Sequence, residues 1–503
     1  MPGATHHLVR WLFLRSLGVV YLVAFASLAT QVSGLIGRRG ILPAAEFMQA
    51  AGAHFDARGV GAMRVAALPT LCWLSASDGF LRGLCVAGVV MAAAVVIGIA
   101  PAPLLGLLWL VYLSLVVVGR DFLAFQWDAL LLETGLLAIL FAPLQPLPAR
   151  SGEAPPSRLA LWLLRWLTFR LMFGSGAVKL ASGDPSWRNL TALTYHYQTQ
   201  PLPNRVAWLA QQLPAWFQRA SCAAMFTVEI GAPLLIFAPR RWRLAGCAAM
   251  VSLQVLIAAT GNYCFFNLLA CTLCLTLLDD AALAWAVPAA WRERLARIRS
   301  GAPGWSPWLL APVAALLFLV TSVEFTSRFL PELPWPRPLT ALCRAAEPFR
   351  STNSYGLFAV MTTTRPEIVV EGSDDGRTWR AYEFRYKPGD VRRAPREVAP
   401  FQPRLDWQMW FAALGTPSDN PWFVGLCVRL LEGSPEVLAL LGRNPFPAAP
   451  PRVVRARLYD YRFSTLAELR ADGAWWRREL LGDYLPAISL RDRGGAGELG
   501  TSD

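Results

Sequence analysis

The stretch FLAFQWDALLLETGLLAILFAP, residues 122–143, is apolar enough to enter a bilayer and yet carries Gln126, Asp128 and Glu133. A charged side chain left without a partner at the centre of a bilayer costs on the order of 3 kcal/mol or more. The two carboxylates therefore need partners. The residues that act as these partners determine how the rest of the chain folds around this segment.

The composition indicates an integral membrane protein. Of 503 residues, 55% are hydrophobic and 16% charged, with a mean hydropathy of +0.38, whereas soluble domains carry about 25% charged residues. Long apolar windows recur before residue 325 and not after it. We therefore predict an α-helical polytopic membrane domain, residues 1–323, a C-terminal soluble domain, residues 324–490, and a disordered tail, residues 491–503.

Nine apolar segments are predicted to form membrane helices, and the shorter ones are candidates for re-entrant elements. They cover residues 11–30, 81–99, 103–119, 122–144, 159–181, 222–238, 244–260, 263–278 and 308–323. If all nine span, three Arg-rich loops share the amino-terminal side, which predicts that this side is cytoplasmic. The connection 182–221 and the C-terminal domain are then extracytoplasmic. One loop, containing Arg38, Arg39, Arg58 and Arg64, disagrees with this orientation.

The next apolar segment, LALWLLRWLTFRLMFGSGAVKLA, carries Arg165, Arg170 and Lys179. Asp128 and Glu133 are five residues apart, as are Arg165 and Arg170. In an antiparallel helical hairpin, one register would bring Asp128 opposite Arg170 and Glu133 opposite Arg165. We predict these two ion pairs or a shared network of the four side chains. The network would either hold the helices together or line a polar cavity that binds a substrate or moves protons.

The connection SGDPSWRNLTALTYHYQTQPLPNRVAW contains His196 between two tyrosines. This pattern favours an interfacial aromatic cluster in which the histidine packs and forms hydrogen bonds. His196 and Lys179 are also the candidates for a catalytic role. No nucleophile motif or metal-binding His pair accompanies them, and GxxxxGK[ST], GxSxG and HExxH are absent. The sequence therefore predicts no metal and no cofactor, and it leaves catalysis open.

The net charge of +13 does not indicate a nucleic-acid partner, because the arginines are spread over short loops rather than gathered in a basic stripe. Most of the nine cysteines lie in apolar segments, where small buried side chains are expected. Cys271 and Cys274 lack further ligands for zinc. Cys343 and Cys427 are the pair in the C-terminal domain, and a disulfide between them is an open alternative in an oxidising compartment.

In the C-terminal domain, apolar and polar residues alternate with a period of two, as is typical of β-strands. RPEIVVEGSDDGRTWRAYEFRYKPG, residues 365–389, predicts a β-hairpin around a Ser-Asp-Asp-Gly turn. RVVRARLYDYRF, residues 452–463, predicts another strand, and residues 418–441 and 465–481 have helical periodicity. We predict a β-rich, sandwich-like domain with a few helices.

Several long strings carry a family resemblance. They are FQWDALLLETG, LLRWLTFRLMFGSGAVKLASGDPSWRNLTALTYHYQTQPLPN, LIAATGNYCFFNLLACTLCLTLLDD, NSYGLFAVMTTTRPEIVVEGSDDGRTWRAYEF and APFQPRLDWQMWFAALG. Together they resemble the lipase maturation factor family over about residues 21–486. The animal members are endoplasmic-reticulum membrane proteins that secreted homodimeric lipases need to reach their active fold. The resemblance implies a folding or maturation factor, with membrane lipids and a secreted lipase-like client as partners.

The run LDWQMWFAALG contains Trp407, Met409, Trp410 and Phe411, which would offer a client-binding surface or pack as core. A composition rich in Ala, Arg and Pro favours a bacterial member in the cytoplasmic (inner) membrane. The alternative function is a membrane enzyme acting on a lipid or quinone-like substrate in the polar cavity, since the multi-span architecture also resembles vitamin K-dependent carboxylase-like domains. An enzyme requires a water-accessible cavity lined by the charges, whereas a maturation factor requires packed ion pairs and an exposed apolar patch.

Overall fold

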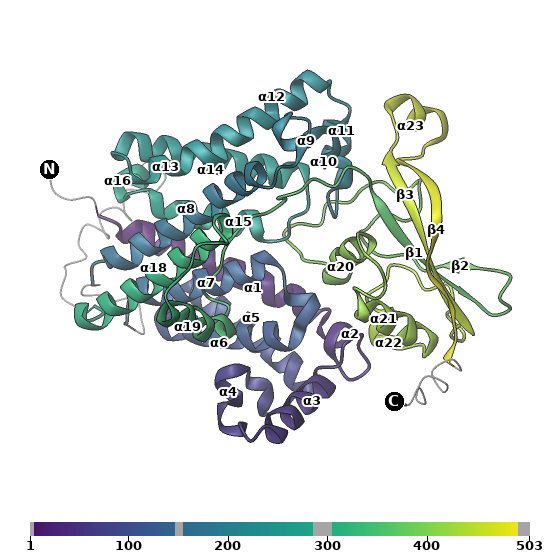
Figure 1. The fold of residues 1–503 in the computed structure, drawn as a ribbon, viewed down its shortest axis with the longest axis horizontal. Helices are drawn as coiled ribbons and strands as arrows, with labels where there is room; N and C mark the ends of the chain where they lie inside the picture. The colour runs from purple at the N-terminus through teal and green to yellow at the C-terminus, as the bar shows by residue number, and fades with distance from the viewer. Residues whose placement is uncertain (1–4, 146–153, 285–303, 491–503) are drawn as a thin grey trace.

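A computed structural model describes residues 5–145, 154–284 and 304–490. The predicted tail, residues 491–503, lies outside the described residues, as do the arginines between 292 and 299. Figure 1 shows a body of helices whose one end meets the sheet and its neighbouring helices. These elements belong to residues 351–490, here called the C-terminal region. The elements of the C-terminal region therefore lie beyond one end of the helices.

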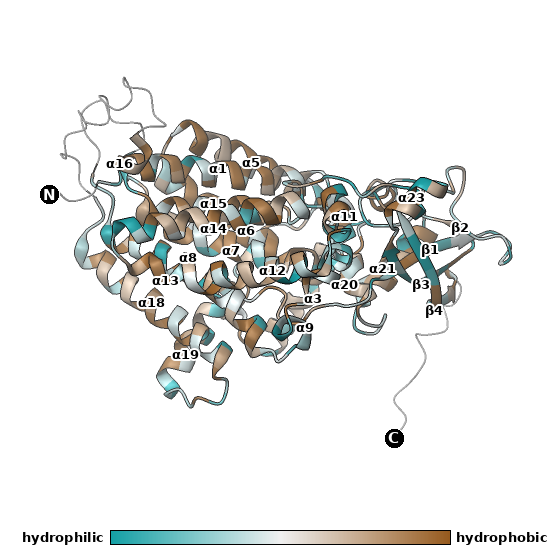
Figure 2. Ribbon diagram, turned by 90° about the horizontal axis from the view of Figure 1, so that it is seen from above, coloured by the Kyte–Doolittle hydropathy of each residue, from teal (hydrophilic) through white to brown (hydrophobic). Residues whose placement is uncertain are grey.

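The helical body is built from long apolar helices joined by short ones, and Figure 2 shows the long helices as mostly hydrophobic. The α-helices that overlap the predicted membrane segments are α1 (His7–Ala29), α5 (Asp78–Ile97), α6 (Pro101–Gly119), α7 (Gln126–Phe141), α8 (Arg158–Ala181), α12 (Ala215–Phe226), α13 (Ala232–Leu234), α14 (Arg240–Thr260), α15 (Phe266–Cys274) and α18 (Pro307–Phe329). The other described α-helices of the body are α2 (Val32–Ile36), α3 (Ala44–Ala57), α4 (Arg64–Ala67), α9 (Pro185–Arg188), α10 (Leu193–Thr199), α11 (Arg205–Gln211), α16 (Asp280–Leu283) and α19 (Arg337–Ala346).

All nine predicted segments contain helix, but the prediction of nine spans is not confirmed. Within the described residues, six helical segments are long and apolar enough to cross a membrane. They are His7–Ala29, Asp78–Ile97, Pro101–Leu123, Ala215–Phe237, Arg240–Thr260 and Pro307–Phe329. By contrast, α7 has 16 residues and α15 has 9, fewer than the roughly 20 that a bilayer requires.

The C-terminal region contains one antiparallel sheet in the order β2-β1-β3-β4. Its elements are β1 (Pro366–Ser373), β2 (Arg380–Ala381), β3 (Val453–Phe463), β4 (Trp476–Ile488), α20 (Arg404–Ala413), α21 (Pro421–Leu431), α22 (Pro435–Leu438) and α23 (Leu466–Asp472). The predicted hairpin is confirmed in part: Glu371 lies opposite Ala381, but the second strand is limited to Arg380–Ala381. The sandwich is not confirmed, because the described strands form a single sheet and α20 contacts β1. The helix predicted for 465–481 is confirmed only as far as Asp472, where α23 ends, and from Trp476 onward the chain forms β4 instead.

One hydrophobic core extends through both regions. It joins Leu28 of α1 and Leu130 of α7 to Trp407 of α20 and Phe423 of α21, each of them at most 2% exposed. Residue 324, the predicted boundary between the domains, lies inside α18. The C-terminal region is therefore packed directly onto the helical body.

The predicted alternative of a Cys343–Cys427 disulfide is wrong. All nine cysteines are free thiols. Cys343 lies on α19 and Cys427 on α21, where the Cys427 side chain is fully buried. Cys427 is thus a small hydrophobic residue of the core.

Candidate functional site at the junction of the helices and the sheet

The two carboxylates of the stretch 122–143 both lie on α7 and are both buried, Asp128 with 0% and Glu133 with 1% of its surface exposed. Residues five apart on a helix point in directions that differ by about 140°. Asp128 and Glu133 therefore face different neighbours. Each of them meets a different part of the C-terminal region.

Asp128 forms an ion pair with Arg404 of α20. The guanidinium reaches both carboxylate oxygens, with Nη2 at 2.9 Å from Oδ1 and Nη1 at 3.0 Å from Oδ2. Nη1 also donates to the carbonyl of Phe122 at 2.7 Å, and the hydroxyl of Tyr112 donates to Asp128. Both charged side chains are fully buried. This bidentate pair fixes α20 in a defined position against the start of α7.

Glu133 forms an ion pair with Arg170 of α8. Its Oε2 accepts hydrogen bonds from the hydroxyl of Tyr355 at 2.7 Å and from Nδ2 of Asn353 at 3.3 Å. Nη1 of Arg170 donates to the carbonyl of Asn353 at 2.7 Å. Asn353 and Tyr355 belong to the segment between α19 and β1. The second carboxylate of α7 therefore also holds a part of the chain that follows the helical body.

The predicted pairs Asp128–Arg170 and Glu133–Arg165 are wrong. Arg170 binds Glu133, and Nε of Arg165 donates to the carbonyl of Thr276 at 2.9 Å. The prediction sought partners only in the next apolar segment. The partner of Asp128 is instead 276 residues away in sequence.

Lys179 and His196, the candidate catalytic residues, are both engaged. Nζ of Lys179 lies 2.7 Å from Oε2 of Glu229, which sits on the π-helical turn Thr227–Gly231. Nε2 of His196 lies 2.9 Å from the hydroxyl of Tyr263. Burial, together with the positive charge of Lys179, lowers the pKa of His196 to about 4. His196 is therefore neutral at physiological pH, as expected for a histidine that packs among aromatic rings.

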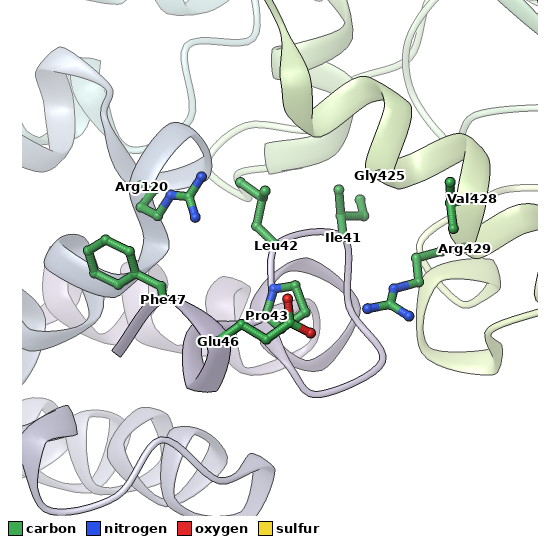
Figure 3. A pocket seen from close by; sticks show the side chains of 9 residues that line it. All are labelled: Ile41, Leu42, Pro43, Glu46, Phe47, Arg120, Gly425, Val428 and Arg429. Atoms are coloured by element: carbon green, nitrogen blue, oxygen red, sulfur yellow. The ribbon is translucent and has the colours of Figure 1, made fainter. Parts of the chain in front are cut away.

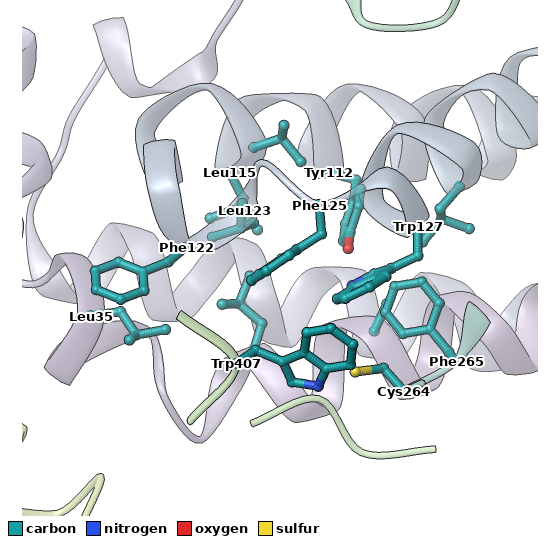
Figure 4. Close-up of a cluster of buried hydrophobic side chains, with 14 of the residues drawn as sticks. Leu35, Tyr112, Leu115, Phe122, Leu123, Phe125, Trp127, Cys264, Phe265 and Trp407 are labelled. Carbon is teal, nitrogen blue, oxygen red and sulfur yellow. The ribbon is translucent and has the colours of Figure 1, made fainter. Parts of the chain in front are cut away.

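Most of the aromatic run in α20 is core rather than surface. Three of its residues are buried: Trp407, Met409 and Trp410. Figure 4 shows Trp407 beside Phe125 and Trp127, and the rings of Trp127 and Trp407 have centroids 4.6 Å apart. Phe411 is 42% exposed. Of the two alternatives, core packing therefore holds for Trp407, Met409 and Trp410, and Phe411 is an exposed ring beside them.

An open cleft of about 750 Å³ lies between the start of α7, the segment before β1, and α20. Its aromatic walls include Phe125, Trp127, Tyr263, Phe358, Trp407 and Trp410. Phe358 has a φ of 54°, a left-handed conformation that is uncommon for a bulky residue. Val360, Phe411 and Leu414 also line the cleft and are 67%, 42% and 44% exposed. The cleft is thus suited to an apolar partner.

A smaller pocket of about 170 Å³ lies where α3 and α21 approach the end of α6 (Figure 3). Arg120 and Arg429 face it from two sides, and Glu46 lies between them. Arg429 donates from Nε to the carbonyl of Gly40 at 2.8 Å and from Nη1 to Glu432 at 2.7 Å. The contacts of Arg429 join α21 to the loop before α3.

The comparisons with known proteins follow this division of the chain. The model of the lipase maturation factor transmembrane domain matches residues 8–285. The model of the lipase maturation factor C-terminal domain matches residues 351–486. The chain belongs to the lipase maturation factor family. The Asp128–Arg404 ion pair joins the two domains of this lipase maturation factor family member, and both Asn353 and Tyr355 fall at the beginning of the second domain.

The relatives are similar along nearly the whole chain. Lipase maturation factor 2 of Gallus gallus is 38% identical over 96% of this chain and 82% of the relative. Lipase maturation factor 2 of Homo sapiens is 38% identical over 97% of this chain and 84% of the relative. Lipase maturation factor 1 of Bos taurus is 35% identical over 98% and 91%. No solved structure matches this chain.

Sequence reasoning missed three members of the site: Arg404, Asn353 and Tyr355. All three lie in strings that carry the family resemblance, APFQPRLDWQMWFAALG and NSYGLFAVMTTT. An arginine preceded by Pro and followed by an apolar aromatic helix is a weak signal of burial. A search for positive charges outside the membrane segments would have included Arg404 among many candidates, because buried carboxylates require a cation wherever it lies in the sequence.

Proposed function

We propose that this protein is a membrane-anchored maturation factor that helps a secreted lipase-like client to fold or assemble through its C-terminal region, on the extracytoplasmic side. Support comes from the names of its relatives and from the six helical segments able to cross a membrane. The connection 182–221 and the C-terminal region lie together. Arg365, directly before β1, donates to the carbonyls of Gln198 and Pro201 at 2.7 and 3.0 Å.

The cleft with its apolar rim is the observation that carries the proposal. A folding client exposes apolar side chains that are later buried in its core, and a concave aromatic surface is suited to hold them. Phe411, with Val360 and Leu414, would contact the client. Trp407, Met409 and Trp410 would act indirectly, by keeping this surface rigid. A rigid surface loses little conformational entropy on binding.

The alternative of a membrane enzyme is less well supported. It requires Asp128, Glu133 and Arg170 to line a water-accessible cavity. These side chains are at most 2% exposed and bind one another or the C-terminal region. Packed ion pairs beside an exposed apolar rim match the expectation for a maturation factor instead.

The client contact is tested with a photocrosslinking amino acid at position 411 in the intact protein, in cells that secrete a lipase-like protein. We expect crosslinks to that protein. Phe411→Asp should weaken client capture by about 30-fold, the loss typical of an aromatic hot spot, and should lower the yield of active lipase. Leu481, which is 57% exposed on β4 and does not line the cleft, is the matched control position.

Equal crosslinking from positions 411 and 481, or an unchanged lipase yield in Phe411→Asp, would overturn the client contact. The topology is tested separately by a reporter fused after residue 490. Activity of a reporter that functions only outside the cytoplasm is expected. Activity of a cytoplasmic reporter at the same position would place the C-terminal region on the other side.

A further inference from the structure

The connection between α8 and α12 presents a row of large apolar side chains to the outside. These residues, here called the connection patch, are Val206, Leu209, Leu213, Trp216 and Phe217, and they are 41–70% exposed. They come from α11, the turn after it and the first residues of α12. Five such side chains within 12 residues exceed the scattered exposure that is normal for a protein surface.

The patch is one face of an amphipathic element. Val206 and Leu209 are three residues apart on one face of α11, and Leu213 follows in the turn after the helix. The opposite face of α11 is buried, with Trp208 3% exposed. Nε1 of Trp208 donates to the carbonyl of Ser464 at 2.9 Å, and its ring packs edge-on against Trp475 at 5.1 Å. One face of α11 therefore binds the C-terminal sheet region, and the other has no protein partner among the described residues.

The continuation of the chain identifies what covers the patch. Trp216 and Phe217 are the second and third residues of the candidate membrane span Ala215–Phe237. Trp residues at the ends of spans sit at the level of the lipid headgroups. The helix α11 precedes this span by only three residues. The patch therefore lies where the bilayer meets water, and the lipid surface is its partner.

The charge of the connection selects the class of lipid. The connection 182–221 contains Arg188, Arg205 and Arg219 and a single acidic residue, Asp184, which accepts from the N–H of Met361. All three arginines are exposed. Basic side chains beside an apolar face are the pattern of helices that lie in the interface of anionic membranes.

We propose that α11 and the start of α12 form an interfacial anchor, with the connection patch inserted at the boundary between headgroups and acyl chains of anionic lipids. Through Trp208, the same anchor holds the end of the β3–β4 pair at the membrane surface. This role is distinct from client binding, because none of the patch residues lines the aromatic cleft. It gives the C-terminal region a second attachment to the membrane, in addition to the buried ion pairs.

Depth-dependent quenching tests the insertion. The intact protein, with a fluorescent amino acid at position 209, is placed in nanodiscs that contain lipids with a spin label near the headgroup or near the acyl-chain end. We expect strong quenching by the shallow label and weaker quenching by the deep one. Position 481 on β4 is the control and should be quenched by neither. A label at position 213 provides a second reading if the variant at 209 does not fold.

Labels at both 209 and 213 that are quenched as little as the label at 481 would overturn the anchor. The lipid class is tested with brominated phosphatidylglycerol or brominated phosphatidylcholine at equal mole fractions. We expect quenching at 209 to show an enrichment of the anionic lipid of up to about fivefold for each basic side chain near the surface. The enrichment should fall in the Arg205→Gln/Arg219→Gln variant. Equal quenching by the two lipids would overturn the preference for anionic lipid.

Discussion

At the scale of single residues, the buried charges of α7 specify where the C-terminal region sits. Removing two charges from water costs several kcal/mol per ion, so a buried pair contributes little net stability compared with apolar packing. The buried pair does, however, destabilise any other arrangement of the chain in which one of the two charges is buried without its partner. Asp128 and Arg404 satisfy each other together with Tyr112 and the carbonyl of Phe122. The pair therefore acts mainly to select one docking position.

This account predicts strong coupling between Asp128 and Arg404. Asp128→Leu alone leaves a buried guanidinium without its counter-charge and should lower the free energy of unfolding by about 3–5 kcal/mol. Arg404→Met should cost a similar amount. The double variant should recover most of this loss, because no buried charge remains. The stabilities of the two single variants and the double variant are measured by heating each protein in mild detergent and monitoring its unfolding by size-exclusion chromatography.

The exposed pair Arg380–Asp374 is the control, since its side chains are 46% and 57% exposed. Breaking it should change stability by less than about 1 kcal/mol. If the Asp128/Arg404 double variant is as unstable as the sum of the two single variants, the docking role of the pair is wrong.

Asp128 shows how much of this site could be predicted from the sequence. Its position in an apolar segment already required a buried partner, and that requirement is met. The partner itself was predicted from the register of two neighbouring apolar segments, and that prediction was wrong. A salt bridge across 276 residues leaves no periodic signal in either segment. It depends on the tertiary packing of α20 against α7, which local patterns do not contain.

His196 predicts a pH dependence of stability. Burial and Lys179 lower its pKa to about 4 in the folded protein, compared with about 6.5 in an unfolded chain. Between pH 6.5 and 4, the unfolded state therefore binds a proton that the folded state does not. Stability should fall as the pH decreases through this window, by on the order of 2–3 kcal/mol in total, and this contribution should not change above pH 6.5.

The measurement is the difference in stability between the wild type and His196→Gln from pH 7.5 to pH 4. Glutamine keeps a hydrogen-bonding group near the hydroxyl of Tyr263 and does not titrate. The difference between the two proteins should shrink as the pH falls, because only the wild type loses stability by protonation at this position. A constant difference over the whole range would show that His196 does not titrate in this way.

At the scale of elements, the segment between α19 and β1 is irregular backbone that runs beside the helices of the body. Its polar groups find partners there: the carbonyl of Asn353 accepts from Arg170, and the carbonyl of Phe358 accepts from Nε1 of Trp187 at 3.0 Å. Backbone without helical hydrogen bonds is tolerated at membrane depth only where protein groups satisfy it. Arg170 of α8 and Trp187 of α9 thus allow a non-helical segment to pack against the helical body.

Tyr355 tests the attachment of this segment. The side chain is 1% exposed and its hydroxyl binds Glu133. Tyr355→Ala leaves a cavity and should cost about 3 kcal/mol or more, and Tyr355→Phe should cost about 1–2 kcal/mol for the lost hydrogen bond. Arg350 is exposed, but Ser351 and Thr352 after it are buried, so trypsin needs a local opening to cleave there. Cleavage after Arg350 should therefore rise by about 100-fold or more in the first variant and by about tenfold in the second.

Cleavage after Arg377, in the exposed turn between β1 and β2, is the internal control and should keep its rate in both variants. Equal cleavage at Arg350 in all three proteins would mean that Tyr355 does not hold the segment. Equal cleavage in the two variants, above the wild type, would assign the whole effect to the hydroxyl.

Prediction of the elements succeeded where the signal is local. The Ser-Asp-Asp-Gly turn determined the β1–β2 hairpin, and Asp375 caps that turn by accepting from the N–H of Arg377 and Thr378. Thr465 and Glu468 form a capping box that begins α23. The strand β4 was missed because it lies at the edge of the sheet and pairs only with β3, with register shifts at several positions. Such a strand depends on its partner rather than on its own periodicity.

At the scale of the whole molecule, the two family domains share one core and exchange buried charges. Asp128 lies in the first domain and Arg404 in the second, and the apolar surface of α7 around Phe125 and Trp127 is covered by Trp407. Neither domain buries these groups without the other. The helical domain is therefore expected to depend on the C-terminal region for its stability, rather than to serve as an independent anchor.

A chain that ends after residue 330 tests this dependence. It retains the Glu133–Arg170 pair but loses Arg404 and Trp407, so that Asp128 lies unpaired beside an uncovered aromatic surface. We expect a much smaller monodisperse fraction in size-exclusion chromatography than for the full chain. Adding Asp128→Asn should restore part of it, since the uncompensated charge costs several kcal/mol, while the uncovered aromatic surface remains. A chain that ends after residue 490 is the control and should behave as the full chain. If the 1–330 chain is as monodisperse as the full chain with Asp128 unchanged, the helical domain folds alone, and the buried ion pair serves docking without supporting the fold of the membrane helices.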